Sequence, residues 1–427
     1  MARTTVAVRG ARMGRVVVLL AAVAAAAQAG GEELAVSVTA GDKPLRGAPV
    51  RAVIEGAATQ AALYAEGRPI PVQLRPAGGR TEVLWIVDQL RAGGRRTYRL
   101  VTGDAGRAPA GQGVAVEQRG GSVEVRIDGQ LFARYDATTG PNKPYFHPLY
   151  GPGGRLMVRK YPLETVPTET HDHPHHRGLW FTHGEVNGHD FWSEGPNAGR
   201  TVCRGFEALE GGPVMGGFRS RTDWLAKDGT RVAEDVRQVR VWRLPECRIL
   251  DFEVTVRATE GPLVFQDTKE GSFGIRLPDT MRVKGGDGRI LTSRGDRDAA
   301  AWGKRAEWVD YWGTVEGAVM GVAILDHPDN PRHPTYWHVR DYGLFAANPF
   351  GVHDFVPGQP KGTGDLTVPA GGTVTFRYRV LLHPGAAAEA GVADAWAAYA
   401  APPRVEVRRL AASARDSWRE HALDVWR

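Results

Sequence analysis

Short runs in which hydrophobic and polar residues alternate recur along most of the chain. In one such run Val123, Val125 and Ile127 alternate with charged residues, and a glycine follows at position 129. Successive side chains of a strand point to opposite faces of a sheet, so this pattern predicts a strand with one buried and one solvated face. The same pattern returns in the segments 34–40, 69–74, 82–90, 96–103, 236–244, 248–259, 263–277, 317–328 and 372–385.

Helical periodicity is almost absent between these runs. Parallel sheets need helical crossovers, which the pattern does not predict, so we expect a mostly-β fold with a large antiparallel β-sandwich preceded by a small β module. The segment GDAGRAPAGQG (103–113) has no apolar period and is interpreted as a linker. We therefore expect a small N-terminal β-sandwich module at 32–110, a main β-sandwich domain at 114–385, and an Ala-rich, partly helical tail at 386–427.

The first 29 residues have the features of a signal peptide. A basic start with four arginines precedes an apolar stretch at 16–27, and a small-residue cleavage motif, AQA, ends at residue 29. The alternative is a membrane anchor, but this run of twelve residues is shorter than the roughly 20 that span a bilayer. We therefore expect cleavage, export to the periplasm or the medium, and no integral membrane segment in the mature chain.

Charge and cysteine content narrow the function classes. The net charge is +6, but removal of the signal segment leaves 50 basic and 48 acidic residues. A nearly neutral chain without basic blocks gives no electrostatic reason to expect a nucleic-acid partner. The two cysteines, Cys203 and Cys247, lie beside strand-like segments. Outside the cytoplasm they would form either a disulfide or two buried thiols, and both alternatives stay open.

The segment HDHPHHRGLWFTHGEVNGHDFW (171–192) holds six of the thirteen histidines. If it is extended, His171, His173 and His175 share one face, and converging imidazoles bind transition metals. Alternatively, histidines beside Arg177, Trp180 and Trp192 suit a sugar site, with imidazole for proton transfer, guanidinium for an oxyanion or carboxylate, and indole as a platform for the ring. A hydrogen-bonded polar core is the third interpretation, because clustered titratable groups are only probabilistic signs of function.

Other loops contribute candidates of the same kind. The segment 141–154 brings Asn142, Lys143 and His147 onto one Pro- and Gly-bounded loop, where a solvated lysine is the simpler interpretation. In FQDTKEGSFGIRL (265–277) we expect Glu270 to be the functional carboxylate, because burial in an apolar strand would make it a stronger base. A surface ion pair with a neighbouring Lys or Arg is the alternative. The segment 326–355 adds polar residues on Pro-broken loops.

Motifs spread over about 143–351 resemble a bacterial family known as the PmoA family, or methane oxygenase PmoA, which is largely a domain of unknown function. They are KPYFHPLYGP, HDHPHHRGLWFTHGEVNGHDFW, KEGSFGIR, WVDYWG and YGLFAANPFG. The resemblance implies a place among bacterial glycan-use genes, and so a saccharide substrate and work alongside sugar oxidoreductases. The methane activity in the name belongs to an integral membrane subunit, which a chain without spanning segments does not match.

The pattern of strands is also similar to the galactose-mutarotase-like super-sandwich proteins. In mutarotases a histidine acid and a glutamate base open the sugar ring. That likeness implies His173, His175 or His176 as the acid, Glu270 as the base, and Arg177 with Asn348 as substrate-orienting groups. The mutarotase sequence signatures are missing from this chain. These roles are therefore assigned by the chemistry of the residue types and not by matching motifs.

The sequence therefore predicts an extracytoplasmic carbohydrate-active enzyme that uses His/Glu acid–base catalysis for epimerisation, elimination or glycosidic cleavage. The expected catalytic residues are His173, His175, His176 and Glu270. The expected substrate-binding residues are Asn142, Lys143, His147, Arg177, Trp180, Arg276, Asp341 and Asn348.

Two rival functions stay open. The first is a metal-dependent enzyme, including an oxygenase, and the second is a non-catalytic carbohydrate-binding protein. No cofactor is predicted, because nucleotide-binding and metalloprotease motifs are missing from the sequence. If a divalent transition metal binds, we expect its ligands to be His171, His173, His175 and His176.

Overall fold

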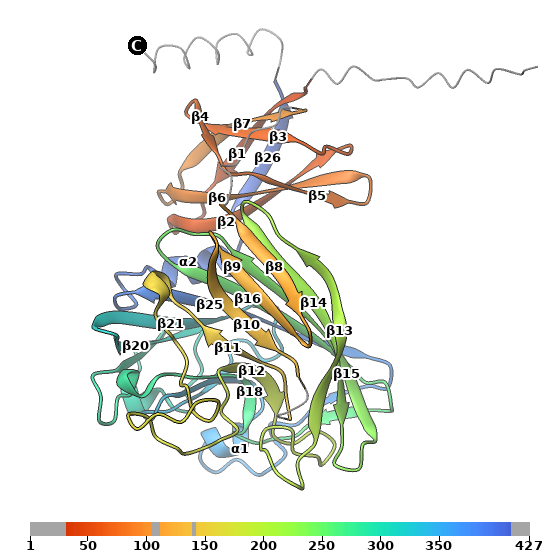
Figure 1. The fold of residues 1–427 in the computed structure, drawn as a ribbon, viewed down its shortest axis with the longest axis vertical. Helices are drawn as coiled ribbons and strands as arrows, with labels where there is room; N and C mark the ends of the chain where they lie inside the picture. The colour runs from red at the N-terminus through yellow and green to blue at the C-terminus, as the bar shows by residue number, and fades with distance from the viewer. Residues whose placement is uncertain (1–30, 104–111, 139–141, 411–427) are drawn as a thin grey trace, which may run out of the picture.

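The structure is a computed structural model that describes residues 31–103, 112–138 and 142–410. Strands dominate these residues, helices are few and short, and the paired strands run antiparallel. Figure 1 shows a small β module stacked on the end of a larger β-sandwich. The predicted fold class is therefore confirmed.

Within the described ranges, the sandwich has two eight-stranded sheets. Sheet I has the strand order β22 (Tyr336–Val339), β23 (Leu344–Asn348), β18 (Gly271–Arg276), β12 (Leu179–His183), β11 (Tyr145–Leu149), β10 (Gln130–Asp136), β9 (Ser122–Ile127) and β8 (Val114–Arg119). Sheet II has the order β13 (Arg200–Glu210), β14 (Met215–Leu225), β15 (Arg231–Trp242), β16 (Arg248–Arg257), β25 (Thr373–Pro384), β21 (Ala318–Asp326), β20 (Trp308–Val315) and β19 (Arg289–Thr292).

The two sheets pack face to face through aromatic side chains. Phe181 of β12 lies 5.5 Å, between ring centroids, from Phe376 of β25, and Phe273 of β18 stacks on Tyr378 of β25 at 4.8 Å. All four rings are fully buried. Because neighbouring residues of a strand face opposite ways, the residues that flank Phe181 and Phe273 point out of the sandwich on the far side of sheet I.

The N-terminal module has a core of its own and two sheets. One is ordered β26 (Arg404–Arg409), β1 (Glu33–Thr39), β7 (Arg95–Thr102), β3 (Ala61–Ala65) and β4 (Arg68–Ile70). The other is ordered β2 (Leu45–Glu55), β6 (Arg80–Leu90) and β5 (Gln73–Ala77). The first strand of the chain thus pairs with the last one, β26.

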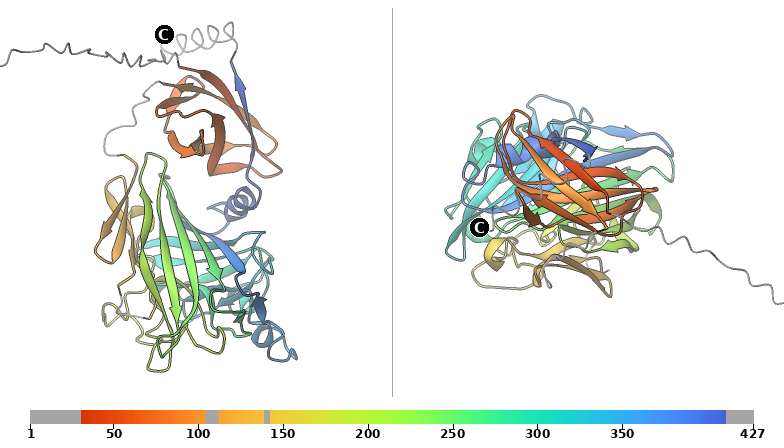
Figure 2. Two further views of the ribbon diagram at one scale, coloured as in Figure 1. Left: turned by 90° about the vertical axis from the view of Figure 1, so that its right-hand side faces the viewer. Right: turned by 90° about the horizontal axis from the view of Figure 1, so that it is seen from above.

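A third apolar cluster joins the module to the sandwich. Figure 2 shows the boundary between these two parts. Leu84 of β6, Trp242 of β15 and Val392 of helix α2 (Val392–Ala400) belong to it. The Gln73 side chain accepts hydrogen bonds from the backbone N–H groups of Val214 and Met215 across the same boundary. The tail that the sequence predicts to be partly helical therefore contributes one helix and one strand up to residue 410, and the remainder lies outside the described residues.

The remaining short elements connect the sheets. They are the two-stranded pair β17 (Leu263–Phe265) and β24 (Leu366–Val368), helix α1 (Val352–Phe355), and the 3₁₀ turns η1 (Pro152–Gly154), η2 (Asp279–Met281) and η3 (Asp298–Ala301). Cys203 and Cys247 are both free and half-buried, so they do not form the disulfide that the sequence left open. Burial raises the pKa of the Cys247 thiol to about 11.

Among the described residues, no helix is long and apolar enough to cross a bilayer. The segment 1–29, with its predicted signal, lies outside the described residues. Export of the protein therefore stays a prediction.

We expect Phe181→Ala to lower the free energy of unfolding by about 3–5 kcal/mol, because the cavity would open where the two sheets meet. Equilibrium denaturation in urea measures the change. Val53→Ala, at a side chain that is 46% exposed, is the control and is expected to stay within about 0.5 kcal/mol of the wild type. Equal effects of the two substitutions would contradict the assigned core.

Candidate functional site

A pocket of about 400 Å³ lies over the outer face of sheet I. One row of paired residues crosses the sheet there: His338 of β22 faces Ala346, Ala346 faces Gly274, and Gly274 faces Trp180 of β12. Directly paired residues place their side chains on the same face, so small residues separate a histidine from a tryptophan. A Cβ at Gly274 would lie 3.0 Å from the Trp180 ring, which explains why glycine stands there.

Ten residues line the pocket, and they come from segments far apart in the chain. They are His173, His175, His176, Trp192, Ser193, Lys269, Glu270, His338, Arg340 and Tyr342. All four predicted catalytic residues are among them, whereas none of the eight predicted substrate-binding residues is.

The loop that carries three of these histidines, residues 170–178, is a turn and not the extended strand that the sequence suggested. The backbone N–H of His176 donates to the carbonyl of His173 at 3.0 Å, and His173 itself has a left-handed φ of 45°. The turn leaves His171 apart from the pocket, where its ring stacks on Tyr161. The common face that His171, His173 and His175 would share in an extended strand is therefore not formed.

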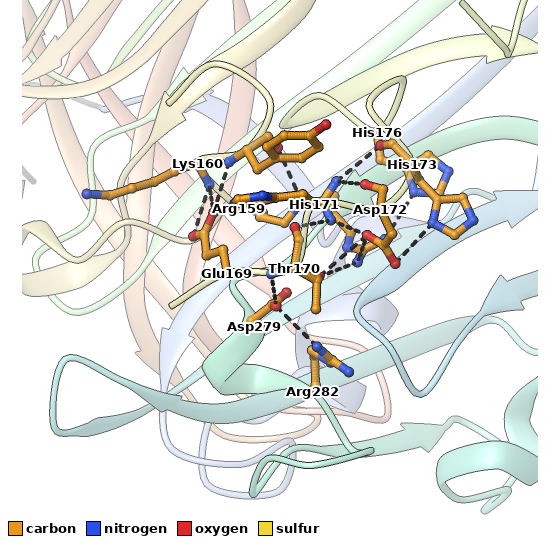
Figure 3. Close-up of polar contacts among 12 residues, drawn as sticks. Arg159, Lys160, Glu169, Thr170, His171, Asp172, His173, His176, Asp279 and Arg282 are labelled. Atoms are coloured by element: carbon orange, nitrogen blue, oxygen red, sulfur yellow. Dashed lines mark hydrogen bonds and ion pairs between the residues drawn. The ribbon is translucent and has the colours of Figure 1, made fainter. Parts of the chain in front are cut away.

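Two buried arginines, Arg159 and Arg276, hold this histidine loop in place. Figure 3 shows Arg159 beside Asp172. Arg276 donates to Asp172 Oδ1 at 2.8 Å, and Arg159 hydrogen-bonds the same carboxylate. Arg159 also donates to the backbone carbonyls of Asp172, at 2.8 Å, and His173, at 3.1 Å. We call the three charged residues the arginine clamp. They fix the path of the loop because each guanidinium bonds both the carboxylate and a second group on the loop.

The clamp also sets the charges beneath the pocket. Burial would raise the pKa of Asp172, but Arg276 and Arg159 outweigh it and lower that pKa to about 2. Burial, together with repulsion from Arg159, lowers the pKa of Arg276 to about 10. Arg276 is still charged at neutral pH, and its guanidinium shares the carboxylate of Asp172 with that of Arg159.

Four rings form a continuous stack along the wall of the pocket. Tyr342 lies parallel to His173 at 5.3 Å, His173 parallel to His176 at 4.8 Å, and His176 nearly parallel to Trp180 at 5.5 Å. In the clamp, Asp172 Oδ2 lies 3.1 Å from Nδ1 of His173. A carboxylate in that position orients an imidazole and compensates positive charge on it when the ring takes up a proton.

The other imidazoles of the pocket are neutral at pH 7. Burial, assisted by Lys143, lowers the pKa of His175 to about 4, and burial lowers that of His338 to about 3. Burial also moves the pKa of His176 well below its ordinary value. Such rings act as hydrogen-bond donors, acceptors or bases, whereas the mutarotase likeness implied His173, His175 or His176 as the acid.

Hydrogen bonds fix the tautomer of two of these rings. The indole N–H of Trp302 donates to Nδ1 of His338 at 3.3 Å, and Arg276 donates to Nδ1 of His176 at 3.2 Å. Indole and guanidinium groups only donate, so Nδ1 is the acceptor in each ring and Nε2 carries the proton. Each ring therefore keeps an N–H donor on its other nitrogen.

Glu270 precedes β18 at the end of a tightly anchored loop. Asn348 donates to the Thr268 carbonyl at 2.9 Å, and Asp354 accepts from the Lys269 backbone N–H at 2.8 Å. The Glu270 side chain is 36% exposed and lies 3.4 Å from the Lys269 ammonium group. The expected burial in a strand is therefore wrong, and the ion pair that the sequence offered as the alternative is present.

A buried ion-pair network occupies three of the predicted substrate-binding residues. Arg177 pairs with Glu194 through two hydrogen bonds of 2.8 Å. Lys143 lies 3.3 Å from the same carboxylate and donates to Asn142 and to the Trp192 carbonyl. Burial lowers the pKa of Lys143 to about 8, although Glu194 opposes the shift. The network holds the chain at Trp192 and Ser193 in place and does not reach the pocket itself.

The other predicted substrate-binding residues also act from behind the pocket walls. Trp180 and Arg276 support the histidine loop, and Asn348 anchors the Glu270 loop. The Nε2 atom of His147 is buried without a hydrogen-bond partner among the described residues. Asp341 contributes its backbone carbonyl to Tyr311 and Lys284.

Six lining residues are absent from the set that the sequence predicted. They are Trp192, Ser193, Lys269, His338, Arg340 and Tyr342. A strand-pairing map would have identified His338, since it lies in one row with Trp180 across four strands. The sequence alone has no signal of comparable strength for Ser193 or Tyr342.

The four histidines considered as metal ligands do not form a metal-binding group. His171 stacks on Tyr161, and His173 contacts the Asp172 carboxylate. Within the described ranges, no three His, Cys, Asp or Glu side chains are arranged to hold a metal ion.

We expect Asp172→Asn to destabilise the protein at pH 7 by roughly 2 kcal/mol, because both arginines of the clamp lose their shared negative charge while the half-exposed site is partly solvated. The folded pKa of Asp172 is about 2, below its ordinary value. Its stabilising effect is thus complete above pH about 4 and is lost as the pH falls through 2. Urea unfolding at pH 7 and pH 3.5 measures the difference in the free energy of unfolding between the wild type and the variant. This difference should be smaller at pH 3.5.

The matched control for this variant is Asp42→Asn, at an exposed carboxylate in the N-terminal module. It should change the urea midpoint little at either pH. An Asp172 variant as stable as the wild type would contradict the role of the clamp.

Stability should fall as the pH drops below 6.5, because His338 has its folded pKa lowered to about 3. Between those pH values the unfolded chain binds a proton that the folded chain does not, so acid favours unfolding. We expect His338→Gln to flatten the fall of the urea midpoint between pH 6.5 and pH 4. Val319→Ala, an exposed substitution without a titratable group, should keep the wild-type slope. An unchanged slope in the His338 variant would refute this assignment.

Residues 122–397 match a family of unknown function, DUF6807. Two solved structures are similar over 89% of this chain, each with 12% sequence identity. One is a protein in the glycosyl hydrolase family 38 from Enterococcus faecalis, with a TM-score of 0.39. The other is an alpha-mannosidase from Enterococcus faecalis V583, with a TM-score of 0.41.

The chain spans 47% and 46% of those two structures. No curated protein matches it. Because the family match covers more than half of the chain, this protein belongs to the DUF6807 family.

Proposed function

We propose that the protein is an enzyme that acts on a saccharide by His/Glu acid–base catalysis in the pocket over sheet I. One observation carries the proposal: three histidines of one loop, His338 of β22, and Glu270 of a third segment line the same pocket. Titratable groups that gather from distant segments at one concave site are typical of active sites.

The shape and chemistry of the pocket support a sugar as the substrate. A volume of about 400 Å³ lies within the range of small-molecule sites. Trp192 and Tyr342 add aromatic rings to the lining, and the neutral imidazoles offer N–H donors to hydroxyl groups. The expected likeness to mutarotase-like proteins points to the same substrate class.

Two groups are suited to move protons. His173 has its ring oriented by Asp172 at 3.1 Å, so it can give and receive a proton while the carboxylate balances its charge. Glu270 is solvent-accessible beside Lys269 and serves as the carboxylate base. His175, His176 and His338, which are neutral, bind and polarise the sugar oxygens.

The reaction class follows from this pair of groups. Epimerisation, elimination and glycosidic cleavage each need one group that removes a proton and one that delivers a proton. The proposal therefore covers all three reactions. We also propose that the protein is exported. The resemblance to the PmoA family motivates the further proposal that it works alongside sugar oxidoreductases.

We expect Glu270→Gln and His173→Ala to lower kcat about 10²- to 10⁴-fold with little change in the urea midpoint, because each removes a proton-transfer group from the pocket. The measurement is turnover of a panel of mono- and oligosaccharides, followed by ¹H NMR. Glu246→Gln, at an exposed carboxylate away from the pocket, is the control and should keep wild-type activity.

Saccharide affinity without turnover in the wild type would instead support the carbohydrate-binding protein considered from the sequence. Full activity of both the Glu270 and His173 variants on any substrate that the wild type turns over would overturn the assigned chemistry. A protein that neither binds nor converts any saccharide of the panel would contradict the substrate class.

A further inference from the structure

Arg340 differs from the other arginines around the pocket. Its guanidinium lies over the rings of Trp302, at 5.6 Å, and Tyr342, at 5.5 Å, between the guanidinium carbon and each centroid. Within the described part of the chain, that guanidinium has neither an ion pair nor a hydrogen bond. It nevertheless lines the pocket.

The neighbouring arginines each bond a carboxylate of the protein. Arg177 is bonded twice to Glu194, and Arg276 and Arg159 share Asp172. A guanidinium has five donors, so one without an acceptor at the wall of a pocket is available to a ligand. Two aromatic rings hold it in place without using those donors.

Positive charge exceeds negative charge around the pocket. Glu270, which is the only acidic residue of the lining, lies 3.4 Å from Lys269 and is balanced by it. In the clamp beneath, two arginines share one carboxylate. Arg340 therefore remains as an uncompensated cation of the lining.

The lowered pKa of His338 is consistent with uncompensated positive charge in the pocket. Burial is the main reason that its pKa is lowered, and Arg340 and Lys269 lower it further. The two cations thus act on a group that lines the same pocket. An anionic ligand would reduce the repulsion between the two cations.

We propose that the pocket binds an acidic saccharide and that Arg340 receives its carboxylate; this inference rests on the proposed saccharide-processing function. A guanidinium fork matches a carboxylate with two parallel N–H···O bonds, which a sugar hydroxyl cannot reproduce. The carboxylate would be the group that sets substrate specificity. Arg340 is thus a specificity residue, and proton transfer stays with His173 and Glu270.

The test compares sugars that differ only in that group. Glucuronate with glucose, and galacturonate with galactose, are titrated into the purified protein by calorimetry, and the methyl glycosides of each pair are assayed for turnover. We expect the acidic member of at least one pair to bind about tenfold or more tightly than its neutral partner. Added salt should weaken only the acidic member.

Two substitutions at Arg340 test the assignment of the carboxylate. Arg340→Gln should remove the preference, so that the acidic sugar binds no more tightly than its neutral partner. Arg340→Lys, which keeps the charge but loses the fork, should retain part of the preference. Arg91→Gln, at an exposed arginine of the N-terminal module, controls for the loss of one positive charge and should bind as the wild type does. Unchanged melting temperatures exclude misfolding.

The possible outcomes separate this inference from the proposed function. Turnover or binding of neutral sugars alone would overturn the acidic-saccharide inference and leave saccharide processing standing. A preference for the acidic sugar that survives in Arg340→Gln would refute the role of Arg340. If no sugar of either kind binds or is converted, both the inference and the proposed function fail.

Discussion

The site depends on one carboxylate that two buried arginines share. Arg159 and Arg276 have no exposed side-chain surface, and desolvation of a guanidinium costs several kcal/mol unless it is well bonded. Asp172 and the backbone carbonyls of the histidine loop supply those bonds. The same contacts bend the loop, stack His173 on His176, and give the His173 ring its carboxylate partner. A structural requirement of the buried charges thus positions the groups that face the pocket.

The sheet contributes a second constraint, which is geometric. Gly274 and Ala346 lie between His338 and Trp180 in one row of sheet I, and the missing side chain of Gly274 leaves room for the rings of Trp180 and Trp192. These two tryptophans belong to a separate apolar cluster on the outer face of the sheet. The outer face is therefore not a plain solvent-facing surface. It carries a small core of its own, and the pocket lies at the edge of that core.

Much of the fold could be predicted because alternation of apolar and polar residues depends on burial alone. The segment 122–128 and the runs around Phe252 and Tyr378 alternate clearly and are strands. The histidines and Glu270 could be singled out by residue type. The roles of Lys143 and Arg177 could not, since their pairing with Glu194 depends on how the loop after β12 folds back. Arg340 and Tyr342 enter the pocket only because β22 and β23 pair beside β18, which local sequence does not encode.

The pairing of β26 with β1 has a consequence for biosynthesis. The module at the start of the chain lacks an edge strand until residue 409 has left the ribosome. Until then, β1 presents an unpaired edge, and exposed edges invite association with other chains. The N-terminal module therefore stays without β26 while the whole sandwich is synthesised. Pairing of β26 with β1, which completes the sheet, is a late, long-range step of folding.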